Sequence, residues 1–178
     1  MDVGLLILRV VIGSLFVGHG TQKLFGWFGG SGRKGTGKMF GSLGYPWPNQ
    51  MALLAGTTEA GAGAMFALGL ATPLAAAGLI GVMINAVFAV HGKNGLWITK
   101  GGFEYNLVLS AAALAVAWTG PGHLSIDELI AWYPPRPIAG AFALGLGALG
   151  AAAILALRSP QVAEEPARQE QQRPRRAA

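Results

Sequence analysis

The strongest constraint on this chain is the grouping of its apolar residues into long, nearly uninterrupted runs. Hydrophobic residues make up 52% of the sequence and charged residues only 12%, about half the charge of an ordinary soluble domain. A bilayer demands runs of about 20 apolar residues, whereas a soluble core scatters them in amphipathic stripes. Five runs are candidates for membrane spans: 3–24, 51–70, 73–90, 103–119 and 137–157. The sequence therefore predicts an all-α, polytopic membrane protein.

The basic residues predict how the chain lies in the membrane. With five spans, one side of the membrane receives Lys23, Arg33, Lys34, Lys38, Lys93, Lys100, Arg158, Arg168, Arg173, Arg175 and Arg176, and the other receives only Arg136. The positive-inside rule then places the N-terminus outside, the loop 25–50 in the cytoplasm and the C-terminus in the cytoplasm. The pI near 10.0 thus indicates membrane topology, and we expect no nucleic-acid partner. Residues 158–178 are rich in Pro, Gln, Glu and Arg, which predicts a disordered basic tail.

Several ionisable or polar residues fall inside or at the ends of the predicted spans, where each is costly unless it is paired. Counting about 1.5 Å per residue along each helix places Glu59 and Asn85 near mid-membrane, and Arg9 in the outer half. The same count places His19, Lys23, His91 and Glu104 near the cytoplasmic boundary. We expect Arg9 and Glu59 to form the buried charged pair, because a depth difference of roughly 9 Å is within reach of two extended side chains.

Two interpretations of this polar set stay open. In one, the ion pair only fixes helix register. In the other, Arg9, His19, Lys23, Glu59, Asn85, His91 and Glu104 line a pocket for a quinone or another lipophilic ligand, in which His19 or Glu59 relays protons. His19 and His91 share a depth that would allow a bis-histidine haem, but depth agreement alone is a poor argument and we do not expect haem.

The order of short motifs resembles that of the DoxX family of small bacterial integral membrane proteins. The resemblance covers residues 3–130 and rests on Arg9, His19-Gly20 with Lys23, Gly44 and Pro46, Glu59 with Gly61, Gly69 and Thr72, Gly120-Pro121-Gly122, Ser125 and Asp127. It implies a four-helix core in the inner membrane, similar to the membrane subunit of thiosulfate:quinone oxidoreductase. Related members are associated with complexes that handle sulfur compounds or oxidative stress. This chain departs from the family core by the additional helix 137–157 and the tail.

The expected function is therefore a DoxX-like subunit, with core 1–130, that binds a quinone within a membrane oxidoreductase complex. The chain contains no cysteine, which excludes thiolate metal sites and cysteine-held iron–sulfur clusters, and we expect no metal site. Electrons would then come from a membrane or membrane-associated redox partner. The alternatives are a non-catalytic scaffold that recruits partners through 137–178, and a small-solute permease, against which the lack of an inverted repeat argues. The stripes Ala52, Gly56, Ala60, Ala64 and Ala143, Gly147, Ala151 favour close helix packing and would also allow self-association.

Overall fold

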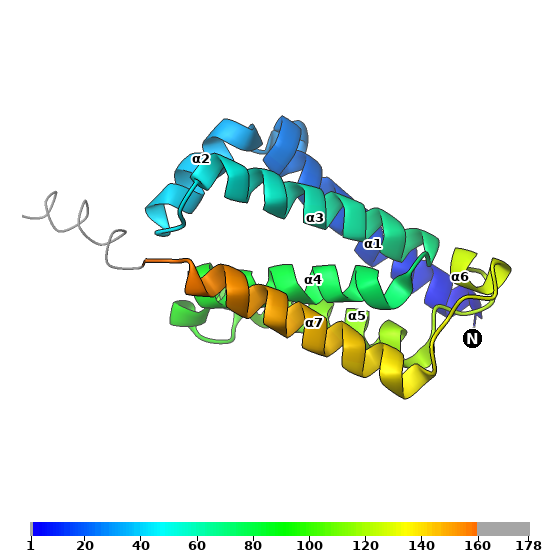
Figure 1. The fold of residues 1–178 in the computed structure, drawn as a ribbon. Coiled ribbons are helices and arrows are strands. Elements are labelled where there is room, and N and C mark those ends of the chain that lie inside the picture. The colour runs from blue at the N-terminus through cyan, green and yellow to red at the C-terminus, as the bar shows by residue number, and fades with distance from the viewer. Residues whose placement is uncertain (1, 160–178) are drawn as a thin grey trace, which may run out of the picture.

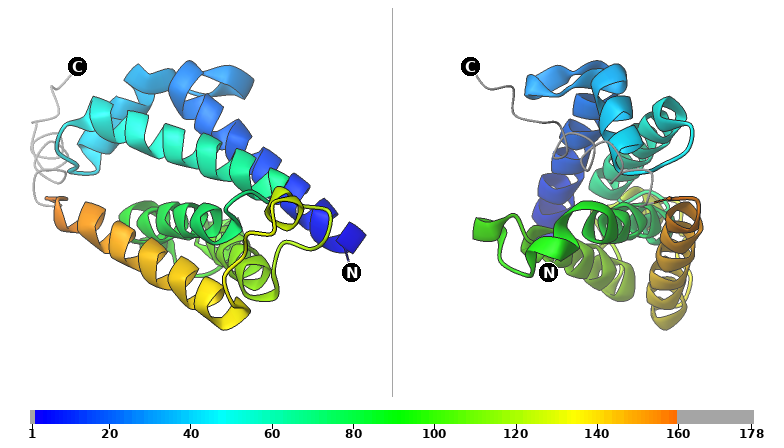
Figure 2. Two further views of the ribbon diagram at one scale, coloured as in Figure 1. Left: turned by 45° about the vertical axis from the view of Figure 1, so that its right-hand side comes forward. Right: turned by 90° about the vertical axis from the view of Figure 1, so that its left-hand side faces the viewer.

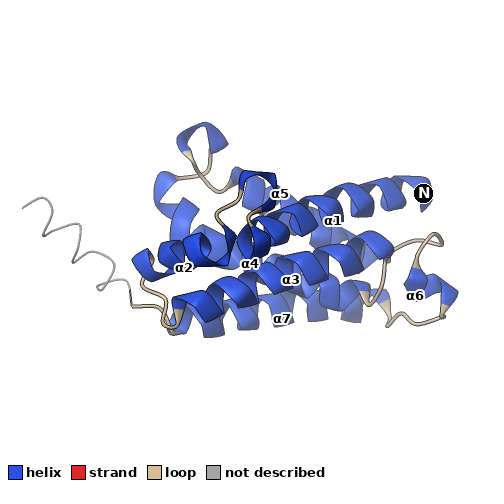
Figure 3. Ribbon diagram, turned by 90° about the horizontal axis from the view of Figure 1, so that it is seen from above, coloured by secondary structure: helices blue, strands red, loops and turns tan. Residues whose placement is uncertain are grey.

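The computed structural model describes residues 2–159, and within them every regular element is a helix (Figure 3). The longer helices are α1 (Asp2–Phe25), α2 (Gly32–Ser42), α3 (Pro48–Leu68), α4 (Thr72–Ala86), α5 (Glu104–Thr119) and α7 (Arg136–Ala156). Short elements are η1 (Trp27–Gly29), η2 (Val87–His91), η3 (Gly92–Asn94), η4 (Ile98–Lys100) and α6 (Ile126–Leu129). The expected all-α polytopic fold is confirmed.

Four helical segments of the described chain are long and apolar enough to cross a membrane: Asp2–Phe25, Pro48–Leu68, Thr72–Asn94 and Arg136–Ala156. The third continues from α4 through the π-helical turn η2 and on to η3. α5 has 16 residues, which correspond to about 24 Å of helix, so it is shorter than each of these four spanning segments. It packs against α4 and α7.

The helices form two layers, one of α1, α2 and α3 and the other of α4, α5 and α7 (Figures 1 and 2). The N-terminus, the α3–α4 turn and α6 lie at one end of the bundle, which we call the α6 end. The α2 helix, the loop after α4 and the last turn of α7 lie at the opposite end, which we call the α2 end. The two layers diverge towards the α2 end (Figure 2).

Start and stop signals in the sequence explain the lengths of the spanning helices. Pro48, Pro73 and Pro137 stand in the first turns of α3, α4 and α7, where a missing backbone N–H has no cost. Gly69 ends α3 with φ +63°, the left-handed conformation that glycine adopts readily. Large apolar side chains on the outer faces, such as Ile7, Leu107 and Phe142, are exposed and form the surface for lipid.

The segment 25–50 contains more structure than its glycine-rich sequence suggests. The segment was expected to be a loop, but within it α2 extends over 11 residues. It packs against α3, and a Cβ at Gly37 would collide with the side chain of Asn49. The additional length depends on this close tertiary contact, because glycine and β-branched residues have low intrinsic helix propensity. Of the tail predicted from 158 onward, residues 160–178 lie outside the described part of the chain.

Glycines bring α1 and α3 into near backbone contact. A Cβ at Gly20 would lie 2.6 Å from the carbonyl oxygen of Gly56 and 2.5 Å from the backbone nitrogen of Ala60, and Gly13 lies against Gly63 in the same way. Small residues allow this approach in lipid, where no hydrophobic force drives helices together. These contacts set the antiparallel register of the two helices.

Replacing Gly20 with valine is expected to lower the free energy of unfolding by about 1–3 kcal/mol, because the added methyl groups must push α1 away from α3. Thermal unfolding in detergent micelles would measure the loss. Gly18→Val is the matched control, since a Cβ at Gly18 meets nothing within 4 Å. Equal melting temperatures of the two variants would contradict this packing.

Candidate functional site

A cavity of about 560 Å³ lies between the two layers. Side chains from α1, α2, α3, α4, α5 and α7, together with the α2–α3 loop and η2, line it. Most of them are apolar, with glycine at positions 78, 81, 147 and 150. A few polar groups are distributed among these apolar walls, which is the composition typical of small-molecule sites.

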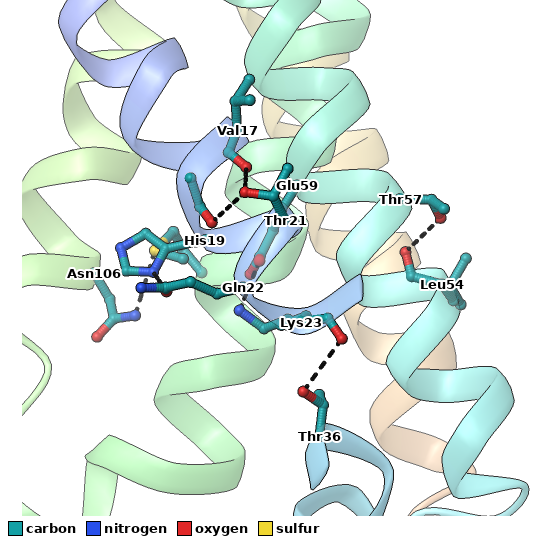
Figure 4. A network of polar contacts seen from close by, with 12 residues as sticks. Val17, His19, Thr21, Gln22, Lys23, Thr36, Leu54, Thr57, Glu59 and Asn106 are labelled. Carbon is teal, nitrogen blue, oxygen red and sulfur yellow. Dashed lines mark hydrogen bonds and ion pairs between the residues drawn. The ribbon is translucent and has the colours of Figure 1, made fainter. Parts of the chain in front are cut away.

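The charged pair of the cavity is Lys23 with Glu59. Lys23 Nζ donates to Glu59 Oε2 at 2.6 Å, and the two side chains are 24% and 4% exposed (Figure 4). Lys23 reaches from the last turn of α1, while Glu59 projects from the middle of α3. Both line the cavity. The prediction that Glu59 pairs with Arg9 was therefore wrong.

The register of α1 against α3 explains this error. The glycine contacts place Gly20 beside Gly56 and Ala60, while Arg9 lies against Gly69. Gly69 is ten residues beyond Glu59 in sequence, which is about 15 Å along the helix axis. The estimate from sequence measured depth along each helix separately and had no information on how the two helices align.

Arg9 belongs to a second polar cluster, at the α6 end of the bundle. Its side chain is fully buried, and its two terminal nitrogens donate to the carbonyl oxygens of Pro121, at 2.7 Å, and Leu124, at 2.5 Å. The same loop carries Asp127, which accepts hydrogen bonds from the backbone nitrogens of Ala71 and Thr72 and from the Thr72 hydroxyl. This cluster fastens the 120–130 loop to the α3–α4 turn and does not line the cavity.

Asn85 lines the cavity, in contact with a tyrosine that was not among the predicted site residues. Tyr45 Oη donates to Asn85 Oδ1 at 2.9 Å, and Asn85 Nδ2 donates to the carbonyl oxygen of Ala151 at 3.3 Å. Burial raises the pKa of Tyr45, which lies in the loop between α2 and α3. In the sequence, Tyr45 stands next to Pro46 and Trp47. Aromatic residues in such a segment are also typical of a membrane interface, so this pattern did not indicate a cavity residue.

His19 and His91 both line the cavity. His19 Nδ1 contacts Gln22 Oε1 at 3.1 Å, and His91 Nδ1 contacts the carbonyl oxygen of Gly101 at 2.9 Å. Because both partners are acceptors, Nδ1 carries the hydrogen in each ring, and Nε2 is then the acceptor of a neutral imidazole.

Glu104 was predicted to line the cavity mouth, and this was wrong. Its carboxylate accepts a hydrogen bond from the backbone nitrogen of Ile98 at 3.0 Å and so closes the loop before α5. On α5 the cavity is instead lined by Tyr105, Asn106 and Leu109. Asn106 is a buried side chain whose Nδ2 donates to Met83 Sδ at 3.3 Å. In residues 2–159, no three His, Asp or Glu side chains gather closely enough to hold a metal ion.

These features define a class of protein: a small helical bundle of the membrane with a largely apolar cavity between its layers and a lysine–glutamate pair whose carboxylate is buried. Comparison with known families assigns it more closely. The DoxX family model matches residues 4–92, from α1 through η2, and the chain belongs to this family. The match includes Lys23, Glu59, Asn85 and His91, while α5 and α7 lie beyond it.

Curated relatives agree with the assignment. The chain is 31% identical over 129 residues to a Bacillus subtilis (strain 168) protein named "Putative oxidoreductase CatD", covering 72% of this chain and 88% of the relative. It is 30% identical to the inner membrane protein YqjF of Escherichia coli (strain K12), covering 72% and 93%. It is 31% identical to the inner membrane protein YphA of the same organism, covering 70% and 88%. No solved structure matches the chain significantly.

Proposed function

We propose that the cavity binds a quinone or a chemically similar lipophilic ligand, and that the protein serves as a subunit of a membrane oxidoreductase complex. The observation that carries the proposal is the cavity itself. Its volume of about 560 Å³ lies within the range of about 300–1,000 Å³ typical of small-molecule sites, and its apolar walls hold a few polar groups.

The polar groups suit a ligand with carbonyl oxygens on an apolar ring. Lys23 supplies an ammonium donor beside Glu59, and Asn85 supplies an amide already oriented by Tyr45. His19 has Nε2 available to accept a proton, so it is the group we assign to proton transfer. Arg9 and Glu104 have no part in this site.

The redox role draws on the relatives and on composition. The name of CatD proposes an oxidoreductase, and the absence of cysteine from the whole chain leaves electron delivery to a partner protein. The proposal includes no haem, and a Soret band in the absorption spectrum of the purified protein would overturn that part of it.

The N-outside orientation is part of the proposal. α2 with its basic residues, the loop after α4 and the end of α7 lie together at the α2 end. The positive-inside rule would place that end in the cytoplasm.

Filling the cavity tests the proposal. Gly150 lines the cavity from α7, and a Cβ there meets nothing within 4 Å, so leucine at this position extends into the space. Gly150→Leu is expected to weaken the binding of decylubiquinone by about tenfold, equivalent to about 1.4 kcal/mol. Fluorescence titration of the protein in lipid nanodiscs measures the dissociation constant.

The matched control is Gly145→Leu, on the same helix. A Cβ at Gly145 also meets nothing within 4 Å, but this residue does not line the cavity, so decylubiquinone affinity should stay unchanged. Equal affinities of the two variants and the unchanged protein would place any quinone site outside this cavity.

The scaffold alternative is tested by a truncation. α7 supplies one wall of the cavity, so deleting 137–178 would damage the site as well as any recruiting surface. Deleting only 160–178 leaves every described cavity residue in place. Loss of complex assembly with unchanged decylubiquinone binding would favour a recruiting role for the tail.

A further inference from the structure

The residues that directly follow α7 are fastened to two other parts of the chain at the α2 end of the bundle. Arg158 Nε donates to the carbonyl oxygen of Leu43 at 2.5 Å, and its Nη1 donates to the carbonyl oxygen of Phe88 at 3.3 Å. The backbone nitrogen of Ser159 donates to the carbonyl oxygen of Gly44 at 2.9 Å. One arginine therefore bridges α7, the α2–α3 loop and η2.

These contacts lie at the rim of the cavity. Leu43 and Tyr45 line the cavity from the α2–α3 loop, Ala89 lines it next to Phe88, and Ile154 lines it one turn before Arg158. The Arg158 guanidinium also lies over the Tyr45 ring, at 5.9 Å from its centroid. We call residues 43–45 the flap, because hydrogen bonds connect them to α4 and to the residues after α7, in the other layer.

The flap is held by three cross-layer hydrogen bonds. Leu43 accepts from Arg158, Gly44 accepts from Ser159, and Tyr45 donates to Asn85. At the opposite end, the Arg9 and Asp127 cluster fastens the α3–α4 turn. The layers diverge from that end towards the flap (Figure 2), so the flap lies where they are furthest apart.

We propose that Arg158 is the latch of the α2 end of the cavity: ligands and water enter through this end when its hydrogen bonds to Leu43 and Phe88 break and release the flap. The ligand part of this inference rests on the proposed function, whereas the latch itself rests only on the contacts. Arginine suits the role because its planar fork donates in two directions at once, which the single ammonium group of lysine cannot reproduce.

Cysteine reactivity tests the latch directly, because the chain contains no native cysteine. The reporter is Met51→Cys, a buried cavity-lining position on α3, treated with a charged, water-soluble methanethiosulfonate reagent in nanodiscs. Arg158→Ala is expected to raise the reaction rate by at least about tenfold, since two hydrogen bonds from a charged donor are lost. Arg158→Lys should give a smaller increase.

The matched control is Arg136→Ala, which removes an arginine from the other end of the same helix and should leave the rate unchanged. Circular dichroism confirms folding of each variant, and Arg158→Lys carries the test if Arg158→Ala does not fold. A rate that is the same in the Arg158 variants and the unchanged protein overturns the latch.

A second measurement separates the latch from the ligand proposal. Decylubiquinone bound in the cavity should protect Met51→Cys from the reagent. Protection without any effect of Arg158→Ala would contradict the latch and leave the proposed function standing. Faster reaction in Arg158→Ala without protection by decylubiquinone would support the latch and contradict the quinone site.

Discussion

Replacing Lys23 with methionine is expected to cause the largest loss of stability of any single change considered for this protein. The substitution leaves the Glu59 carboxylate, which is 4% exposed, without its partner at 2.6 Å. Breaking one side of a buried ion pair costs about 3–5 kcal/mol, because a charge then remains in a poorly solvated place. Denaturant titration in detergent micelles would measure the fall in the free energy of unfolding.

A double variant shows whether the loss comes from the charge. Lys23→Met with Glu59→Gln removes both charges and should recover most of the stability, since a neutral amide costs far less to bury than a carboxylate. Lys34→Met, on an exposed position of α2, controls for the loss of a lysine and should change stability little. If the single and double variants at Lys23 were equally stable, the pair would not be the source of the loss.

The same double variant separates the two interpretations of the pair. If Lys23 and Glu59 only fix helix register, the neutral double variant keeps both its fold and its affinity for decylubiquinone. If they contact the ligand, the variant folds but binds more weakly. Both side chains line the cavity, as the second interpretation requires.

The spanning helices were predictable from the sequence, because the bilayer requirement for long apolar runs is nearly sufficient to place them. Runs at 3–24, 51–70 and 137–157 correspond to α1, α3 and α7 to within a few residues. The run 73–90 captured α4 and most of η2, but not the continuation to Asn94. α2 was largely missed, because its helix depends on packing against α3 and not on an apolar run.

The candidate site was predictable in part. His19, Lys23, Glu59, Asn85 and His91 were selected as polar groups in an apolar setting, and all five line the cavity. Their pairing was not predictable, because it depends on a register that close glycine contacts between α1 and α3 determine. Arg158 was missed because a basic residue next to a charged tail resembles the tail, and only the fold brings it to Leu43 and Phe88.

The second large effect is expected from Arg9, at the end of the bundle opposite the flap. Arg9→Met leaves the buried carbonyl oxygen of Pro121 and the partly buried carbonyl oxygen of Leu124 without their donors. Each unsatisfied buried group costs about 1–3 kcal/mol, so two such groups would cost about 2–6 kcal/mol. Because the Leu124 carbonyl is only partly buried, the expected loss is about 2–4 kcal/mol. Arg9→Lys should have a free energy of unfolding between those of the unchanged protein and Arg9→Met, because a single ammonium group does not span both carbonyls. Denaturant titration measures the three proteins side by side.

The affinity for decylubiquinone provides the control for Arg9→Met. Arg9 does not line the cavity, and its partners belong to the 120–130 loop, so folded Arg9→Met protein should bind decylubiquinone with unchanged affinity. Glu59→Gln, by contrast, should weaken binding, because Glu59 lines the cavity beside Lys23. A parallel loss of affinity in the two variants would show that the clusters act together after all. An effect on stability alone would assign Arg9 to holding the 120–130 loop, and leave the cavity to Lys23 and Glu59.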